Sequence, residues 1–426
     1  MVGVMSGFFI VLMIIGTSVG VSLAITGIFL MIQHGGIPLS TISQIIFDNL
    51  TSYTFVAIPF FIFAGNLLMY GPILTSIVNF ANQLFKKVTG GLAIAVMFVS
   101  IFFGAISGSS AASTAAIGGA TSKAMESLYP KKFVAGLVAS GGTLGLMIPP
   151  SLAFIVIGGI IGIPIMDLFT AGLGAGIIQG LILCVTVYLI AKIKGWKPAS
   201  EEKEAPKVYF GKLGKYLLSS WAILLLPVFI IGGIFMGVFT PTEIAAVSAI
   251  YALFLVMVVY KALTGKELVG VIKDSIYKSC MIYLIIIGAH IFSYALTRFG
   301  VSQAIIDFLV NLEMTTWQFL LVVNLLLLFL GMFMDGSAMT VLMAPLLFPL
   351  AAHFGIDPVH FAVIMVANSE LGTLTPPVGI NLFVMSGVSK MPVMEVAKGV
   401  APFFIALVIF LLLVTYIPAI SLFLLR

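Results

Sequence analysis

Long apolar runs, separated by short polar stretches that carry lysines, make up most of the chain. Many runs extend over about 20 residues, enough for a helix to cross the ~30 Å hydrocarbon core of a bilayer. Two stretches, 90–122 and 316–353, have a Gly-Ser pair inside them and are predicted to form hairpins that enter the membrane and return. The pattern predicts an all-α polytopic membrane protein. Its predicted crossing segments are 5–32, 50–70, 133–163, 170–191, 217–239, 241–260, 279–297, 359–388 and 398–424.

The two halves of the chain repeat one order of helix breakers. Gly-Ser-Ser at 108–110 is followed by Gly-Leu-Met-Ile-Pro-Pro at 145–150, and Gly-Ser-Ala at 336–338 by Gly-Thr-Leu-Thr-Pro-Pro at 372–377. Non-helical backbone survives at membrane depth only where it is buried or lines a polar cavity. Matching breaks in two halves are typical of secondary transporters. The alternative is a chance recurrence in a glycine-rich chain.

The lysines predict opposite orientations for the two halves. They cluster in a few polar stretches, which the positive-inside bias places in the cytoplasm, and none lies between Lys278 and Lys390. The first hairpin is therefore expected to enter from the cytoplasm and the second from outside, as inverted repeats. The N-terminus is predicted to be cytoplasmic and the C-terminus periplasmic. The predicted parts are scaffold helices at 1–85, the first hairpin, broken helix and following helix at 86–191, a cytoplasmic linker with scaffold helices at 192–278, a scaffold arm at 279–315, and the second hairpin, broken helix and terminal helix at 316–426.

Composition supports the membrane assignment and excludes other classes of function. Of the 426 residues, 61% are hydrophobic and 8% charged, against about 25% charged in a soluble domain. The net charge of +5 is explained by cytoplasmic loops and does not indicate nucleic acid binding. Cys184 and Cys280 lie in apolar segments and are predicted to be core residues. The sequence has no P-loop, zinc-protease or serine-hydrolase motif, so no enzymatic activity is predicted.

The breaks carry ligands that suit a sodium ion. A hairpin tip exposes the free carbonyls of one half-helix and the free amides of the next. Proline has no amide to donate, so each Pro-Pro pair leaves carbonyls unpaired upstream. Carbonyl and hydroxyl oxygens are hard ligands that suit Na⁺, although a single Gly-Ser pair is more often a helix-packing contact. The residues predicted to bind sodium are Ser107, Gly108, Ser109, Ser110, Gly145, Ile148, Pro150, Met334, Gly336, Gly372, Thr373 and Thr375.

Charged residues in apolar surroundings are candidates for contact with an anionic substrate. Arg298 ends an apolar segment, and its guanidinium can form paired hydrogen bonds with a carboxylate; the alternative is an arginine that reaches the membrane surface. Asp335 lies at the second hairpin tip, where it serves a ligand or is simply solvated. His290 and Glu370 are candidates for polar contacts within the membrane. The residues predicted to bind substrate are Arg298, Asp335, Ser337 and Ser113.

These motifs resemble the large membrane subunit of tripartite ATP-independent periplasmic (TRAP) transporters. The resemblance rests on Gly-Ser-Ser at 108–110, Leu-Met-Ile-Pro-Pro-Ser at 146–151, Pro-Thr-Glu at 241–243 and Glu-Leu-Gly-Thr-Leu-Thr-Pro-Pro at 370–377, and it covers essentially the whole chain. It implies an importer of the bacterial inner membrane, driven by a Na⁺ gradient. In such an importer a transport domain with two hairpins slides like an elevator against a scaffold.

The resemblance also implies two protein partners. One is a small four-helix membrane subunit, expected as a separate chain because this sequence starts directly with the large-subunit pattern. The other is a soluble periplasmic binding protein that delivers an organic acid, and general likeness favours sialic acid over C4-dicarboxylates. Membrane lipid surrounds the protein, and no cofactor is expected beyond the co-transported Na⁺.

Two alternatives of other classes stay open. A stand-alone carboxylate or cation exchanger would need no binding protein. A channel or a non-transporting membrane partner predicts no Na⁺ dependence of flux.

Overall fold

The computed structural model describes residues 2–33, 38–71, 73–196 and 206–425, and every regular element in these ranges is a helix. Within them, seven helical stretches are long and apolar enough to cross a membrane. The prediction of an all-α polytopic membrane protein is confirmed. Residues 197–205 of the predicted linker, and Arg426, lie outside the described residues.

Within the described ranges, most consecutive helices are separated by only a few residues. Those of the first half are α1 (Val2–Ile14), α2 (Val19–Gln33), α3 (Leu39–Leu50), α4 (Ala57–Leu67), α5 (Ile73–Phe85), α6 (Gly91–Ser107), α7 (Ser110–Glu126), α8 (Lys131–Met147), α9 (Leu152–Ile161) and α10 (Ile165–Ile193). Those that follow are α11 (Pro206–Phe235), α12 (Pro241–Phe254) with the π-helical η1 (Leu255–Val259), α13 (Gly265–Arg298), α14 (Val301–Asn311), α15 (Thr316–Gly331), α16 (Gly336–His353), α17 (Pro358–Thr373), α18 (Ile380–Ser389), α19 (Val393–Tyr416) and α20 (Ala419–Leu422).

Three predicted segments differ from the observed helices. The segment at 5–32 is divided into α1 and α2, because Gly16 takes a left-handed φ of 89°. The segment at 50–70 contains the 11-residue α4, which spans only about 16 Å. The segment at 279–297 is the second part of α13, which begins at Gly265, where Thr264 and Glu267 form a capping box.

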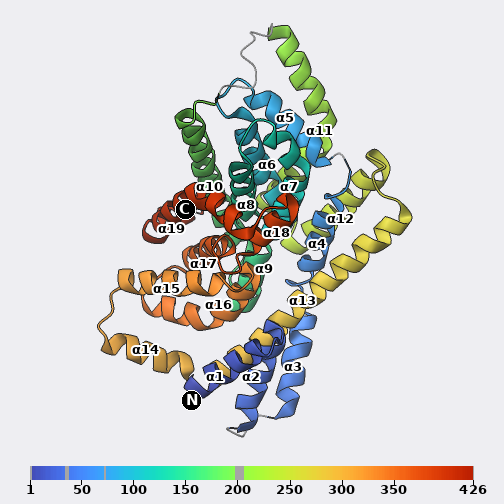
Figure 1. Ribbon diagram of the computed structural model, residues 1–426. Coiled ribbons are helices and arrows are strands. Elements are labelled where there is room, and N and C mark those ends of the chain that lie inside the picture. The colour runs from blue at the N-terminus through green and yellow to red at the C-terminus, as the bar shows by residue number, and fades with distance from the viewer. Residues whose placement is uncertain (1, 34–37, 72, 197–205, 426) are drawn as a thin grey trace.

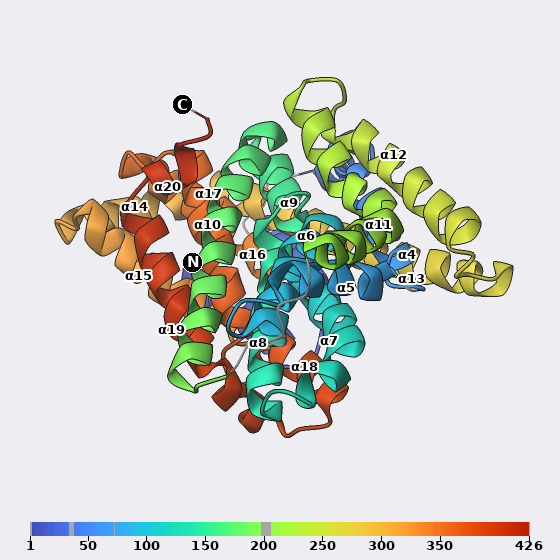
Figure 2. The same ribbon diagram turned by 90° about the horizontal axis from the view of Figure 1, so that it is seen from above.

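The helices form two groups, seen side by side in Figures 1 and 2. We call α2, α4 and α11–α13 the outer layer, in which α13 packs against α2 and α4, and α12 packs against α4. We call α6–α10 and α15–α20 the central bundle, in which α8 packs against α6, α7 and α19. Viewed from above, α4, α11, α12 and α13 lie to one side, and α10, α15, α17, α19 and α20 lie to the other (Figure 2).

Glycines set the closest helix contacts in both groups. In the outer layer, a Cβ atom on Gly20 would lie 2.7 Å from the carbonyl oxygen of Leu284, and a Cβ atom on Gly288 would meet the carbonyl of Gly20. In the central bundle, Gly136 of α8 and Gly399 of α19 bring their backbones into contact in the same way. Small residues allow this approach, which supplies packing energy between helices that lipid would otherwise solvate equally well.

Replacing Gly288 by Ile should force α2 and α13 apart, because the new side chain meets the α2 backbone. Overpacking of this kind costs about 1–3 kcal/mol, so the unfolding temperature of the purified protein should fall. Gly270→Ile, on the same helix with open space around it, is the matched control. Equal unfolding temperatures for the two variants would contradict this account of the contact.

Candidate functional site

The turn between α6 and α7 gathers serine oxygens at a buried hairpin tip. Gly108 ends α6 in the left-handed region, with φ 58°, and Ser109 is the N-cap of α7. The Ser107 Oγ atom lies 2.5 Å from the Ser113 Oγ atom and donates to the carbonyl of Ser109 at 3.2 Å. These atoms can accept further bonds, so the tip is a small cluster of hard oxygen ligands.

The first broken helix lies directly against this tip. The pair Pro149–Pro150, joined by a cis peptide bond, separates α8 from α9. A Cβ atom on Gly108 would lie 2.9 Å from the carbonyl oxygen of Pro150, and one on Gly145 would lie 2.8 Å from the Ser113 Oγ atom. The fold therefore brings together the predicted sodium residues of the first half: Ser107, Gly108, Ser109, Ser110, Gly145, Ile148 and Pro150.

The second tip, between α15 and α16, has a carboxylate where the first has a serine. Asp335 is the N-cap of α16, and its Oδ2 atom accepts the backbone N–H of Ser337 at 3.0 Å. A Cβ atom on Gly336 would lie 3.0 Å from Cδ1 of Leu146, close to the first break. The two tips are thus near each other, although they are far apart in sequence.

The second broken helix is tied to the second tip through the backbone. The carbonyl of Met332 accepts the N–H groups of Val378 (3.2 Å) and Gly379 (3.3 Å). A Cβ atom on Gly331 would lie 2.9 Å from the Cα atom of Gly372. These contacts place Gly372 against the end of α15, next to the turn that carries Met334 and Gly336. Thr373 and Thr375, the other predicted sodium residues of the second half, follow Gly372 in sequence.

The two threonines of this break bond back onto their own helix. The Thr373 hydroxyl donates to the carbonyl of Glu370 at 2.7 Å, and the Thr375 hydroxyl donates to the carbonyl of Leu371 at 2.6 Å. Each hydroxyl oxygen keeps acceptor capacity after donating its proton. Both are therefore suited to face a cation.

A cavity of about 440 Å³ lies between the two tips and the outer layer. Ser107 and Ser109 line it from the first tip, and Asp335 and Ser337 from the second. The outer layer contributes mainly apolar side chains of α4 and α13, together with Lys278 and Asn66. The cavity combines an apolar wall with converging polar groups, the usual character of a small-molecule site.

The cationic side chain that lines this cavity is Lys278, which the sequence analysis used only to orient the chain. Arg298 is at the other end of α13, about 30 Å from Lys278 along the helix at 1.5 Å per residue. It is not among the lining residues, and neither is Ser113, which is buried behind the first tip. The capping box at the start of α13 was the sequence signal that Lys278 lies well inside a helix.

Glu370 forms a second polar cluster within the central bundle. Its side chain is 1% exposed, and its Oε2 atom accepts a hydrogen bond from Gln179 Nε2, which also lies 3.4 Å from the hydroxyl of Thr143. The Glu370 Oε1 atom is buried without a hydrogen-bond partner in the described structure. Glu370 thus links α10 and α17 beside the first break, which agrees with its predicted polar role within the membrane.

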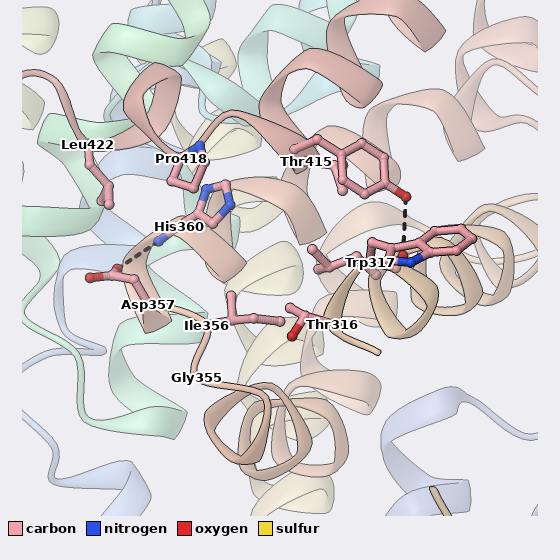
Figure 3. A pocket seen from close by; sticks show the side chains of 11 residues that line it. Thr316, Trp317, Gly355, Ile356, Asp357, His360, Thr415, Pro418 and Leu422 are labelled. Carbon is pink, nitrogen blue, oxygen red and sulfur yellow. Dashed lines mark hydrogen bonds between the residues drawn. The ribbon is translucent and has the colours of Figure 1, made fainter. Parts of the chain in front are cut away.

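Another cavity, of about 480 Å³, lies where α15 begins and α19 ends (Figure 3). Its polar groups are used in local structure: Asp357 caps α17 through the N–H of His360 at 3.1 Å, and the Tyr416 hydroxyl donates to the carbonyl of Trp317 at 3.4 Å. No predicted sodium or substrate residue lines it. The cavity between the tips is therefore the candidate functional site.

Comparison with known proteins identifies the family. The family model described as "Tripartite ATP-independent periplasmic transporter, DctM component" matches residues 6–420. The chain belongs to this family. It is 39% identical over 402 residues to the C4-dicarboxylate TRAP transporter large permease protein DctM of Pseudomonas aeruginosa, a match that covers 94% of this chain and 93% of that protein.

Two further comparisons extend this result. The TRAP permease is 35% identical over 412 residues to the sialic acid TRAP transporter large permease protein SiaM of Vibrio cholerae, covering 96% of this chain and 95% of that protein. Its fold is similar to the crystal structure of the Alcanivorax borkumensis YdaH transporter, with a TM-score of 0.54 at 13% identity over 82% of this chain and 86% of that one. At this identity the likeness concerns the fold alone. The resemblance to TRAP permeases is confirmed, and the protein is a transporter subunit, not an enzyme.

Replacing Gly108 by Ala should disrupt the first tip. Alanine in the left-handed region costs about 1–2 kcal/mol, and its Cβ atom would press on the carbonyl of Pro150. We expect a lower unfolding temperature and a loss of transport. Gly119→Ala, on α7 with open space around it, should keep transport unchanged and should not lower the unfolding temperature, because alanine favours the helix. A Gly108→Ala variant that behaves like this control would show that the tip tolerates a side chain.

Proposed function

We propose that this TRAP permease imports an organic acid into a bacterial cell, driven by a Na⁺ gradient, with the substrate bound in the cavity between the two hairpin tips. The observation that carries the proposal is the meeting of both tips at one cavity, each backed by a broken helix with free oxygen ligands. Paired breaks of this kind hold ions and substrates in secondary transporters.

Sodium is the coupling ion that the ligand chemistry favours. Each tip and its facing break offer backbone carbonyls and hydroxyls, without a cluster of carboxylates that would suit Ca²⁺. In the described part of the chain, no three His, Cys, Asp or Glu residues are placed to hold a transition metal. Two similar oxygen clusters support two Na⁺ sites, one in each half.

The substrate is an organic acid small enough for the cavity. The helices α7 and α16 begin at the tips, and residues of their first turns line the cavity, where the N-terminal end of a helix stabilises a carboxylate. Hydroxyls of Ser107, Ser109 and Ser337 can bond the polar groups of the substrate. Names of relatives include C4-dicarboxylate and sialic acid transporters, and we keep sialic acid as the first candidate. A direct role for Arg298 stays a prediction.

Transport occurs, in this proposal, by an elevator motion of the central bundle against the outer layer. The two hairpins and their broken helices form inverted repeats that move together, and the outer layer is the scaffold against which they move. The cavity lies at the boundary between the groups, where a Cβ atom on Gly65 of α4 would lie 3.2 Å from the Cα atom of Ser107. Because Gly65 has no side chain, no atom at this position obstructs movement of the central bundle along α4.

The permease works with two partners in the bacterial inner membrane and periplasm. A small four-helix membrane subunit accompanies it, and a periplasmic binding protein delivers the substrate, as the tripartite family description suggests. Lipid covers the remaining apolar surface. The N-terminus is assigned to the cytoplasm and the C-terminus to the periplasm, from the lysine distribution.

The test is uptake of sialic acid and succinate into proteoliposomes that contain this chain and its small subunit, with the binding protein added outside. We expect uptake that requires an inward Na⁺ gradient and the binding protein. Uptake without the binding protein would favour a stand-alone exchanger. Flux that does not depend on Na⁺ would favour a channel.

Removing one hydroxyl from either proposed Na⁺ site should weaken sodium binding. For Ser109→Ala and Thr373→Ala we expect the Na⁺ concentration for half-maximal uptake to rise about tenfold, the equivalent of about 1.4 kcal/mol, because each ion loses an oxygen ligand. Ser127→Ala, at the exposed end of α7, is the control. If both variants keep the wild-type Na⁺ dependence, sodium is bound elsewhere.

A further inference from the structure

Lys278 lies within the long helix α13, after a first part that carries four other charged residues and directly before the apolar run 279–297. It follows the start of α13 by about 20 Å at 1.5 Å per residue. Its side chain is 44% exposed and lines the cavity. A charge within a membrane helix is costly and is usually kept for a partner, an ion or a substrate. Because Lys278 also lines the cavity, its position suits contact with a ligand.

The Lys278 ammonium is held by two neighbours in the outer layer. Its Nζ atom lies 2.7 Å from Asp274 Oδ2, one turn earlier on α13, and donates to Asn66 Oδ1 at 3.1 Å. The amide of Asn66 in turn donates to Asp274 Oδ2 at 3.1 Å and to the Ser275 hydroxyl at 2.8 Å. This network fixes which end of the Asn66 amide faces the lysine.

The hydrogen-bond network around Lys278 and Asn66 lies next to the first hairpin tip. Asn66 follows Gly65, which is in close backbone contact with Ser107, and Asn66 and Lys278 both line the cavity. An ammonium group has three donors, and two of them meet Asp274 and Asn66 in the described structure. The third can turn towards a ligand in the cavity without breaking the network.

We propose that Lys278 binds a carboxylate of the substrate, so that the outer layer and both tips together form the substrate site. This inference rests on the proposed function and deepens it. Asp274 neutralises Lys278 while the cavity is empty, and the substrate carboxylate competes for the same ammonium when it enters. A charged group in a partly desolvated cavity is thereby paired in both states, which avoids the cost of an isolated charge.

The competing explanation is a structural link, in which Lys278 and Asp274 only join α13 to α4. A structural link would stabilise the protein without changing how it selects substrates. The two explanations differ in the concentration dependence of uptake, and in discrimination between an acid and its methyl ester, which lacks the negative charge that Lys278 would bind.

The test compares Lys278→Met, Lys278→Arg and Lys273→Met in the complex with the small subunit. Lys273 is an exposed lysine on the same helix outside the cavity. The probes are N-acetylneuraminate and its methyl ester, and succinate and dimethyl succinate, measured by uptake and by the rise in unfolding temperature on binding. For Lys278→Met we expect a half-maximal substrate concentration about 10- to 100-fold higher, the range for a lost hydrogen bond to a charged group.

Four further results are expected if Lys278 binds the carboxylate. Lys278→Met should lose the preference for the acid over the ester, with the Na⁺ dependence unchanged. Lys278→Arg should recover part of the affinity, and Lys273→Met should match the wild type. Asp274→Asn, which removes the competing carboxylate but keeps Lys278, should lower the half-maximal substrate concentration. If Lys278→Met does not assemble, the result for Asp274→Asn distinguishes substrate binding from a structural link.

The opposite results would overturn the inference. If Lys278→Met lowers only the unfolding temperature or the maximal rate, and keeps the wild-type affinity and acid preference, the pair is a structural link. The same conclusion follows if Asp274→Asn raises the half-maximal concentration. If the wild-type complex imports none of the probes under a Na⁺ gradient, the proposed function fails and this inference fails with it.

Discussion

The structure depends on one constraint: backbone groups that are freed where a helix ends inside an apolar protein must find partners there. The central bundle contains four such places, at the two hairpin tips and the two Pro-Pro breaks. Each tip faces a break, so that unpaired carbonyls, amides and hydroxyls lie together. Unpaired backbone groups are unfavourable at a single helix break within the membrane. Where two breaks face each other, the same groups can form ligand sites.

Glycine makes this pairing possible. The first tip touches the first break through Gly108 and Pro150, and the second tip touches the second break through Gly331 and Gly372. A side chain at these positions would separate the backbones whose oxygen atoms must lie close together. The same principle acts at the boundary with the outer layer, where Gly65 allows the first tip to approach α4. Packing and ligand chemistry are thus two results of the same close contacts.

The protein has few charged residues, so a group of them around one cavity indicates a functional site. Only 8% of the residues are charged, yet Lys278, Asp274 and Asp335 gather around the candidate site. The family explains the transporter class and the fold, but relatives named for C4-dicarboxylate and for sialic acid have similar levels of identity. Discrimination between such substrates must come from the few polar side chains that line the cavity.

The sequence by itself determined the four breaks of the central bundle, where a Gly-Ser or Asp-Gly-Ser turn or a Pro-Pro pair interrupts an apolar run. It also determined the membrane class and the family, through long apolar runs and motifs that cover the chain. The sequence could not place Lys278 at the cavity, since the capping box of Thr264 and Glu267 indicates that Lys278 lies inside a helix but not which elements that helix packs against. Only the tertiary structure decided that Lys278 lies at the cavity while Arg298, on the same helix, lies far from it. It also brought Ser107 and Asp335, from opposite halves, to one cavity, because packing between distant segments leaves no local signal in the sequence.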